Sequence, residues 1–212
     1  MGFSMSTRGD GDSEAKGAIR YDSLSIGMSV LAIMIAIYIS TWGQSIALLF
    51  PIILLLSTVA INYYFGRKVE IDPTLDSNEL GDVGLYTVIC LVVMAVGGAF
   101  AAKVFLPSTL LATLSTTDAA MYGTLIAVAE ENLFRGAILS FLAMTTVRPL
   151  AIFASASIFV VYHFSVYRAN SSALMYVFIA GMVLSYACLR TRRLSPAILA
   201  HVINNVAAVM AR

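Results

Sequence analysis

Seven long apolar runs constrain this chain more than any other feature. They cover residues 25–42, 45–65, 85–102, 119–146, 150–167, 173–189 and 196–211. A helix needs about 20 residues, within a range of roughly 17–25, to cross the hydrocarbon core of a bilayer, and each run is close to that length. In lipid, every backbone polar group must be paired within the protein, which leaves helices and closed barrels. The runs therefore predict an all-α, polytopic transmembrane helical bundle of about seven spans.

The composition supports a membrane solvent. Of the 212 residues, 59% are hydrophobic and only 12% are charged, with a net charge of +1. Soluble domains carry about 25% charged residues. A disordered chain would be far more polar, and a nucleic-acid-binding protein would need a basic surface. These classes are therefore excluded, and the expected surroundings are a lipid bilayer, with no nucleic acid among the partners.

The polar segments give the expected organisation. Residues 1–22 mix both signs of charge and predict a flexible cytoplasmic tail. Residues 23–212 would then form a single transmembrane domain. Within it, 70–82 is predicted to be an acidic loop. The stretch 106–114 is too short to span a membrane, but a further short element there would raise the count to eight.

The distribution of Lys and Arg predicts the orientation, because cytoplasmic loops carry the excess of positive charge. With the N-terminus inside and seven spans, nine Lys and Arg residues lie inside and three outside. The nine are Arg8, Lys16, Arg20, Arg67, Lys68, Arg148, Arg190, Arg192 and Arg193, and the three are Lys103, Arg168 and Arg212. The N-terminus is therefore expected in the cytoplasm and the C-terminus outside.

Three ionisable side chains interrupt the fourth run. Glu130, Glu131 and Arg135 lie near the middle of a predicted helix, where an ionisable group costs about 2.5–3.5 kcal/mol and marks a candidate functional site. Glu131 and Arg135 are four residues apart and share a helix face, so they can pair. Glu130 points about 100° away from Glu131. The pair can be a purely structural salt bridge, whereas Glu130 is left for another partner.

The two histidines of the chain also lie in apolar runs. His163 is in the fifth, and His201 is in the seventh, four residues before Asn205 on the same helix face. A carboxylate beside a neutral imidazole can deprotonate a water molecule. An imidazole and an amide on one face can donate hydrogen bonds to an oxyanion. Glu130, His163, His201 and Asn205 together therefore suit the hydrolysis of an amide bond.

The same residues also fit other kinds of chemistry. The motifs G-x-S-x-G and H-E-x-x-H do not occur, which argues against a serine hydrolase and a zinc protease of that type. Two histidines and a glutamate are nevertheless a known zinc-binding set, so Glu130, His163 and His201 could hold a metal. The same groups could form the proton relay of a proton-coupled transporter, or remain in a non-catalytic membrane adaptor.

The order of these residues resembles the CPBP family of intramembrane proteases, which includes CAAX prenyl endopeptidases of the Rce1 type and is also called the ABI family. The motifs are Glu130-Glu131-x-x-x-Arg135, Phe159-x-x-x-His163 and His201-x-x-x-Asn205, together with Phe178-x-x-Gly181, within 119–211. The resemblance implies an intramembrane endopeptidase without a cofactor, although members were once thought to be metalloenzymes. Its substrate would be a membrane-associated protein or peptide, which can be lipid-modified.

The resemblance also assigns roles to these residues. Glu130 and His163 would activate water, His201 and Asn205 would form the oxyanion site, and Glu131 and Arg135 would support them.

Overall fold

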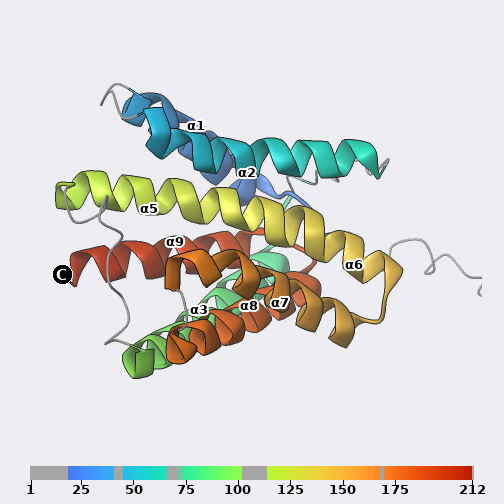
Figure 1. The fold of residues 1–212 in the computed structure, drawn as a ribbon. Helices are drawn as coiled ribbons and strands as arrows, with labels where there is room; N and C mark the ends of the chain where they lie inside the picture. Colours follow the sequence, from blue (N-terminus) through green and yellow to red (C-terminus); the bar gives the residue numbers. More distant parts are fainter. Residues whose placement is uncertain are drawn as a thin grey trace, which may run out of the picture.

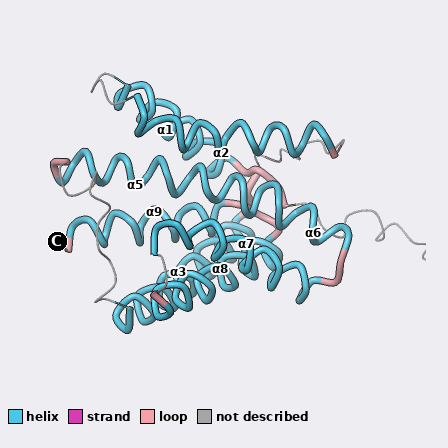
Figure 2. Tube along the Cα trace, viewed as in Figure 1, coloured by secondary structure: helices cyan, strands magenta, loops and turns pink. Residues whose placement is uncertain are grey.

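The computed structural model describes residues 19–40, 45–65, 72, 74–101, 114–167 and 170–211, and these form helices joined by short connections (Figures 1 and 2). No strand occurs among them, although an isolated bridge joins Arg20 and Arg193. The helices are α1 (Ser23–Ser40), α2 (Ser45–Tyr64), α3 (Ser77–Ala101), α5 (Thr116–Glu131), the π-helix η1 (Asn132–Leu139), α6 (Ser140–Thr145), α7 (Arg148–Tyr167), α8 (Ser171–Thr191) and α9 (Ser195–Met210).

Each of the seven predicted runs corresponds to one continuous helical stretch, and the fold is the expected helical membrane bundle. Two helices, at Ser77–Ala99 and Ser171–Thr191, are long and apolar enough to cross a membrane by themselves, and four shorter helices are also apolar. Large apolar side chains face outwards; Ile37, Leu56 and Val92 each expose more than half of their surface. This outward apolar surface is the one that lipid would cover.

The start of α3 corrects the predicted acidic loop at 70–82. The helix begins at Ser77, so Glu79 and Asp82 belong to it. Asp76 caps the helix: its Oδ1 accepts from the Glu79 backbone N–H at 2.7 Å, and Glu79 Oε2 accepts from the Asp76 N–H at 3.4 Å. This reciprocal capping pairs backbone donors that a helix start otherwise leaves open. The predicted short element at 106–114 lies outside the described residues, except for Leu114.

The fourth run forms one long helical stretch with a change of pitch in its centre. It runs from Thr116 to Thr145, and its middle part, η1, is a π-helix. In a π-helix the backbone hydrogen bonds span five residues instead of four, and such turns are frequent at functional sites. The wider turns begin directly after Glu130 and Glu131 and include Arg135.

Residues 19–22, predicted to belong to the flexible tail, are packed against the turn before α9. Ile19 and Asp22 are buried. The Arg20 N–H donates to the carbonyl of Arg192 at 2.9 Å, and the Arg20 carbonyl accepts from the Leu194 N–H at 3.1 Å. Asp22 accepts from the Ser25 N–H at the start of α1 and from the Ser195 hydroxyl. The rest of the predicted tail, residues 1–18, lies outside the described residues.

The helices pack in three layers that place the fourth run at the centre. In Figure 1, α1 and α2 lie on one side of α5 and α9, and α3, α7 and α8 lie on the other. α5 packs along α9, α7 along α8, and α3 against both α8 and α9. Polar residues on α5 and α9 are thereby enclosed by apolar helices.

Candidate active site

Glu130 and Glu131 are the last two residues of α5, and both carboxylates are buried, at 3% and 0% exposure. Because neighbouring residues on a helix point about 100° apart, the two side chains meet different surroundings. Burial of a charged group is costly unless the group is paired. The partners of each glutamate therefore indicate what that glutamate does.

Glu131 is held in an ion pair inside the bundle. Its Oε1 accepts from Arg135 Nη1 at 2.9 Å, and both side chains are fully buried. This is the pair predicted from the four-residue spacing. The same Oε1 lies 2.7 Å from His201 Nδ1. Arg135 also donates to the Gly181 carbonyl at 3.4 Å, and its guanidinium lies 4.3 Å from the centre of the Phe159 ring.

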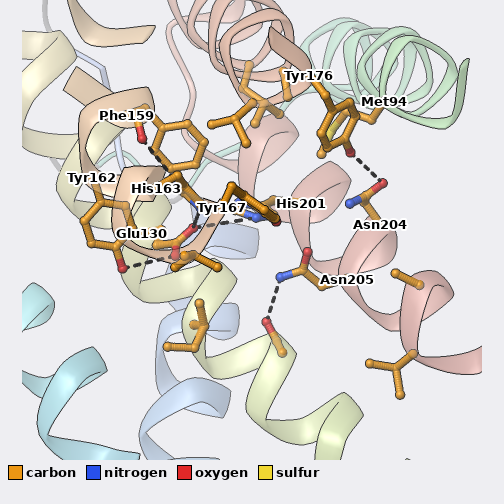
Figure 3. Close-up of a pocket in the computed structure, with 18 of the residues that line it drawn as sticks. Met94, Glu130, Phe159, Tyr162, His163, Tyr167, Tyr176, His201, Asn204 and Asn205 are labelled. Atoms are coloured by element: carbon orange, nitrogen blue, oxygen red, sulfur yellow. Dashed lines mark hydrogen bonds and ion pairs between the residues drawn. The ribbon is translucent and has the colours of Figure 1, made fainter. Parts of the chain in front are cut away.

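Glu130 faces both histidines instead. Its Oε2 lies 3.7 Å from His201 Nε2 and 3.9 Å from His163 Nε2. Its Oε1 accepts from the Tyr162 hydroxyl at 3.3 Å. These side chains come from three helices, α5, α7 and α9, and point towards one another in Figure 3. The structure therefore brings together Glu130, His163 and His201, as the sequence predicted.

The proton positions on the histidines follow from their partners. His163 Nδ1 lies 2.9 Å from the Phe159 carbonyl, which can only accept, so this nitrogen carries hydrogen. His201 Nδ1 donates in the same way to the Glu131 carboxylate. When the imidazoles are neutral, both Nε2 atoms therefore turn a lone pair towards Glu130 Oε2. Glu130 Oε2 and the two Nε2 atoms are then all hydrogen-bond acceptors, so a group that donates hydrogen bonds is needed to link them.

One water molecule would meet this need. The separations of 3.7 and 3.9 Å exceed the usual 2.7–3.2 Å of an N–H···O bond. A water that makes a bond of about 2.8 Å to each atom can bridge such a separation, with an angle of roughly 85° at its oxygen. Glu130 Oε2 is buried and has no hydrogen-bond partner among the described residues. Among the described residues, no group of three or more His, Cys, Asp and Glu side chains has the geometry of a metal site.

Asn205 lines the same cavity, but its amide has another partner. Asn205 Nδ2 donates to the Gly123 carbonyl on α5 at 3.2 Å. In Figure 3 this amide points to α5. Of the six predicted site residues, five therefore share direct contacts or near contacts, and Asn205 stands apart from them.

The cavity is also lined by polar side chains that were not among the predicted site residues. It has a volume of about 330 Å³ and lies between α2, α3, α5, α7, α8 and α9. Tyr162, Tyr176 and Asn204 contribute polar atoms to it. Two of them had a signal in the sequence: Tyr162 precedes His163, and Asn204 lies three residues after His201, on nearly the same helix face. Tyr176 had no comparable signal.

Fold and site together define a helical membrane protein that encloses a glutamate–histidine centre with two carboxylates, two imidazoles and a guanidinium. Residues 112–207 match the family described as "Rce1-like: Type II CAAX prenyl endopeptidase Rce1-like". This segment contains all six predicted site residues, so the part of the chain that carries the site is similar to the Rce1-like family of CAAX-type endopeptidases. No curated protein and no solved structure matches the chain significantly.

Proposed function

We propose that this protein is a glutamate-dependent intramembrane endopeptidase that cleaves a membrane-associated protein substrate. The observation that carries the proposal is the convergence of Glu130 Oε2 on the Nε2 atoms of His163 and His201 within a cavity enclosed by helices. The separation of 3.9 Å between Glu130 and His163 also speaks against a non-catalytic adaptor, since a general base needs to reach its water directly.

Glu130 and His163 are proposed to activate the water. A water held between Glu130 Oε2 and His163 Nε2 gives up a proton to this pair as its oxygen bonds to the carbonyl carbon of the scissile peptide. The electron pair of the C=O bond moves to oxygen and creates an oxyanion. The C–N bond then breaks, the retained proton passes to the departing nitrogen, and the products are a carboxylic acid and an amine.

His201 is proposed to stabilise the oxyanion. It can donate through Nε2 only when it carries both ring protons, because Nδ1–H is already bonded to Glu131. The Glu131 carboxylate, which is shared with Arg135, accepts the Nδ1–H hydrogen bond of such an imidazolium, and Arg135 fixes Glu131 in place. The resemblance adds Asn205 as a second donor. Preorganised donors of this kind contribute roughly 10²–10³ each to the rate.

The substrate class and the topology complete the proposal. The family description names CAAX prenyl endopeptidases, so we propose a substrate with a lipid-modified Cys-a-a-X C-terminus. The apolar and aromatic side chains that line the cavity, among them Phe50, Val166 and Tyr167, would accept such a chain. We further propose a multi-pass protein of about seven spans, with the N-terminus in the cytoplasm, the C-terminus outside and no metal in the reaction.

Cleavage in reconstituted liposomes tests the proposal. The purified full-length protein is mixed with two fluorescent reporter peptides that share one sequence, one farnesylated and one carrying a plain acyl anchor. Glu130→Gln and His163→Asn are compared with Asp82→Asn, which changes an exposed carboxylate on α3. We expect cleavage by the wild type and by Asp82→Asn, and none by the other two variants. Cleavage by both of those variants at the wild-type rate would refute the proposal.

A further inference from the structure

The two oxygens of the Glu130 carboxylate are reached by two consecutive residues of α7. Oε1 accepts a hydrogen bond from the Tyr162 hydroxyl at 3.3 Å, whereas Oε2 lies 3.9 Å from His163 Nε2 (Figure 3). Oε2 has no hydrogen-bond partner, so among the described residues the Tyr162 hydroxyl is the one donor to this carboxylate. The contact with Tyr162 therefore decides which oxygen of Glu130 is left to face the imidazoles.

Such a donor restricts a rotation that matters for a general base. The terminal torsion of a glutamate side chain is broad and roughly two-fold, so the carboxylate plane is not fixed by the chain itself. A general base must hold its water within hydrogen-bond reach. A misplacement of about 1 Å in a catalytic arrangement can cost about 10²-fold in rate. The orientation of Glu130 is therefore worth a dedicated contact.

The ring of Tyr162 is itself held by aromatic side chains from two other elements. It stacks on Phe50 of α2, with the ring centres 5.8 Å apart and an angle of 19° between the planes. It also lies 5.2 Å from the ring of Phe134 in η1, which is only 2% exposed. Aromatic pairs favour offset and tilted arrangements at these separations. The ring contacts would be the same for a phenylalanine, so packing does not account for the hydroxyl.

We propose that Tyr162 is a positioning residue of the proteolytic reaction, whose hydroxyl holds Glu130 Oε1 so that Oε2 faces the attacking water. The inference rests on the proposed function and adds to it a residue at an unspecified position of the motif Phe159-x-x-x-His163. A hydrogen bond to an ionised acceptor is stronger than one between neutral groups, which suits a single hydroxyl for this role. Tyr162 acts through Glu130; it forms no covalent bond and transfers no proton.

Three replacements of Tyr162 separate the hydroxyl from the ring. Tyr162→Phe removes the hydroxyl and keeps the ring contacts with Phe50 and Phe134. Incorporation of 4-aminophenylalanine restores an N–H donor at the same place, and 4-methylphenylalanine fills that place with a group that cannot donate. Tyr186→Phe is the matched control, because Tyr186 is an exposed tyrosine of α8 that does not line the cavity. For each purified protein in liposomes, kcat and KM for the farnesylated reporter are measured below the thermal unfolding midpoint.

We expect Tyr162→Phe to lower kcat by about 10²-fold and to leave KM close to that of the wild type, because the base is misplaced while the substrate still binds. The protein with 4-aminophenylalanine should recover at least about tenfold of this loss, whereas the protein with 4-methylphenylalanine should stay as slow as Tyr162→Phe. Tyr186→Phe should cleave at the wild-type rate. If Tyr162 served packing alone, Tyr162→Phe would keep the wild-type kcat.

A wild-type kcat in Tyr162→Phe, or equal rates for the 4-amino and 4-methyl proteins, overturns the inference and leaves the proposed function intact. A raised KM at an unchanged kcat also overturns it, because the hydroxyl would then bind the substrate instead of orienting the base. If Tyr162→Phe does not fold, the comparison of the two 4-substituted proteins decides in the same way. A wild-type protein that cleaves neither reporter overturns the proposed function and this inference together.

Discussion

The two adjacent glutamates should respond in opposite ways to the same substitution. Glu131→Gln removes the charge that neutralises Arg135, which is fully buried. Arg135 would keep only the Gly181 carbonyl at 3.4 Å and the Phe159 ring as partners. Breaking a buried ion pair by removing one partner costs about 3–5 kcal/mol. For a domain of this size each kcal/mol shifts the unfolding midpoint by about 2–4 °C, so we expect a fall of about 6–20 °C.

Glu130→Gln should leave the unfolding midpoint nearly unchanged. Both histidine Nε2 atoms lie more than 3.5 Å from the Glu130 carboxylate, and its hydrogen bond from Tyr162 can be kept by the amide oxygen of Gln. The substitution also removes a buried charge, which favours the folded state. We therefore expect a midpoint within about 2 °C of the wild type, by the same conversion, and complete loss of cleavage.

The assay is thermal unfolding of the purified protein in one detergent, together with reporter cleavage below the midpoint. The double variant Glu131→Gln/Arg135→Met provides the control, because replacing both members of a buried pair by uncharged groups is often nearly neutral. It should recover at least half of the lost midpoint. A midpoint for Glu131→Gln equal to that of Glu130→Gln would refute the division of roles between the two carboxylates.

Three further predictions follow from other parts of the molecule. Gly181→Ala should destabilise the fold by about 1–3 kcal/mol, because the new Cβ would lie 3.2 Å from the backbone of α7. Gly84→Ala is the control, because a Cβ at that position meets open space, and it should not destabilise the fold. The unfolding midpoints of the two variants are compared with that of the wild type. The hydrogen bond from the Thr74 side chain, with further help from nearby arginines, lowers the pKa of Asp72 below 3.8. The charged form therefore contributes stability at neutral pH, which is lost as the pH falls through the lowered pKa. Amide-exchange protection of the segment next to Asp72 should drop below about pH 4, whereas in Asp72→Asn it should not change there. Dialysis against a chelator should leave the reporter cleavage rate unchanged, and a loss restored only by added zinc would instead favour the metal-dependent alternative.

Local spacing was enough to predict several features of the site. Glu131 and Arg135 are four positions apart, which places both on one helix face, and the structure contains that pair. The same helical periodicity turns the Glu130 side chain away from the face that carries Glu131 and Arg135. The apolar runs located the helices to within a few residues, except at α3, where the capping pair of Asp76 and Glu79 extends the helix into acidic sequence. The hydrophobicity of the run alone does not predict a helix start that depends on such a cap.

Contacts between helices could not be predicted in the same way. The bond from His201 Nδ1 to Glu131 depends on how α9 packs along α5, which no local pattern specifies. Counted from the ends of their spans, His163 and His201 would lie at different depths if the helices were parallel. In Figure 1, α7 and α9 run at an angle to each other, and the two imidazoles meet at one carboxylate.

The choice between the two asparagines shows the same limit. Both Asn204 and Asn205 lie close to the face of His201, and the family motif selects Asn205. The structure engages the Asn205 amide with Gly123 and orients the Asn204 amide through Tyr176 on α8. Both side chains line the cavity, and the partner of each amide is set by how α9 packs against its neighbours, which the sequence of α9 alone does not specify.

Isotope transfer from solvent shows whether Glu130 and two histidines from different helices activate a water against a peptide bond inside the bundle. The wild-type protein in liposomes is supplied with the farnesylated reporter in water enriched in ¹⁸O, and the newly formed carboxylate is analysed by mass spectrometry. We predict one ¹⁸O atom in that carboxylate for the wild type and no product for Glu130→Gln. Labelled product from Glu130→Gln at the wild-type rate would contradict the account.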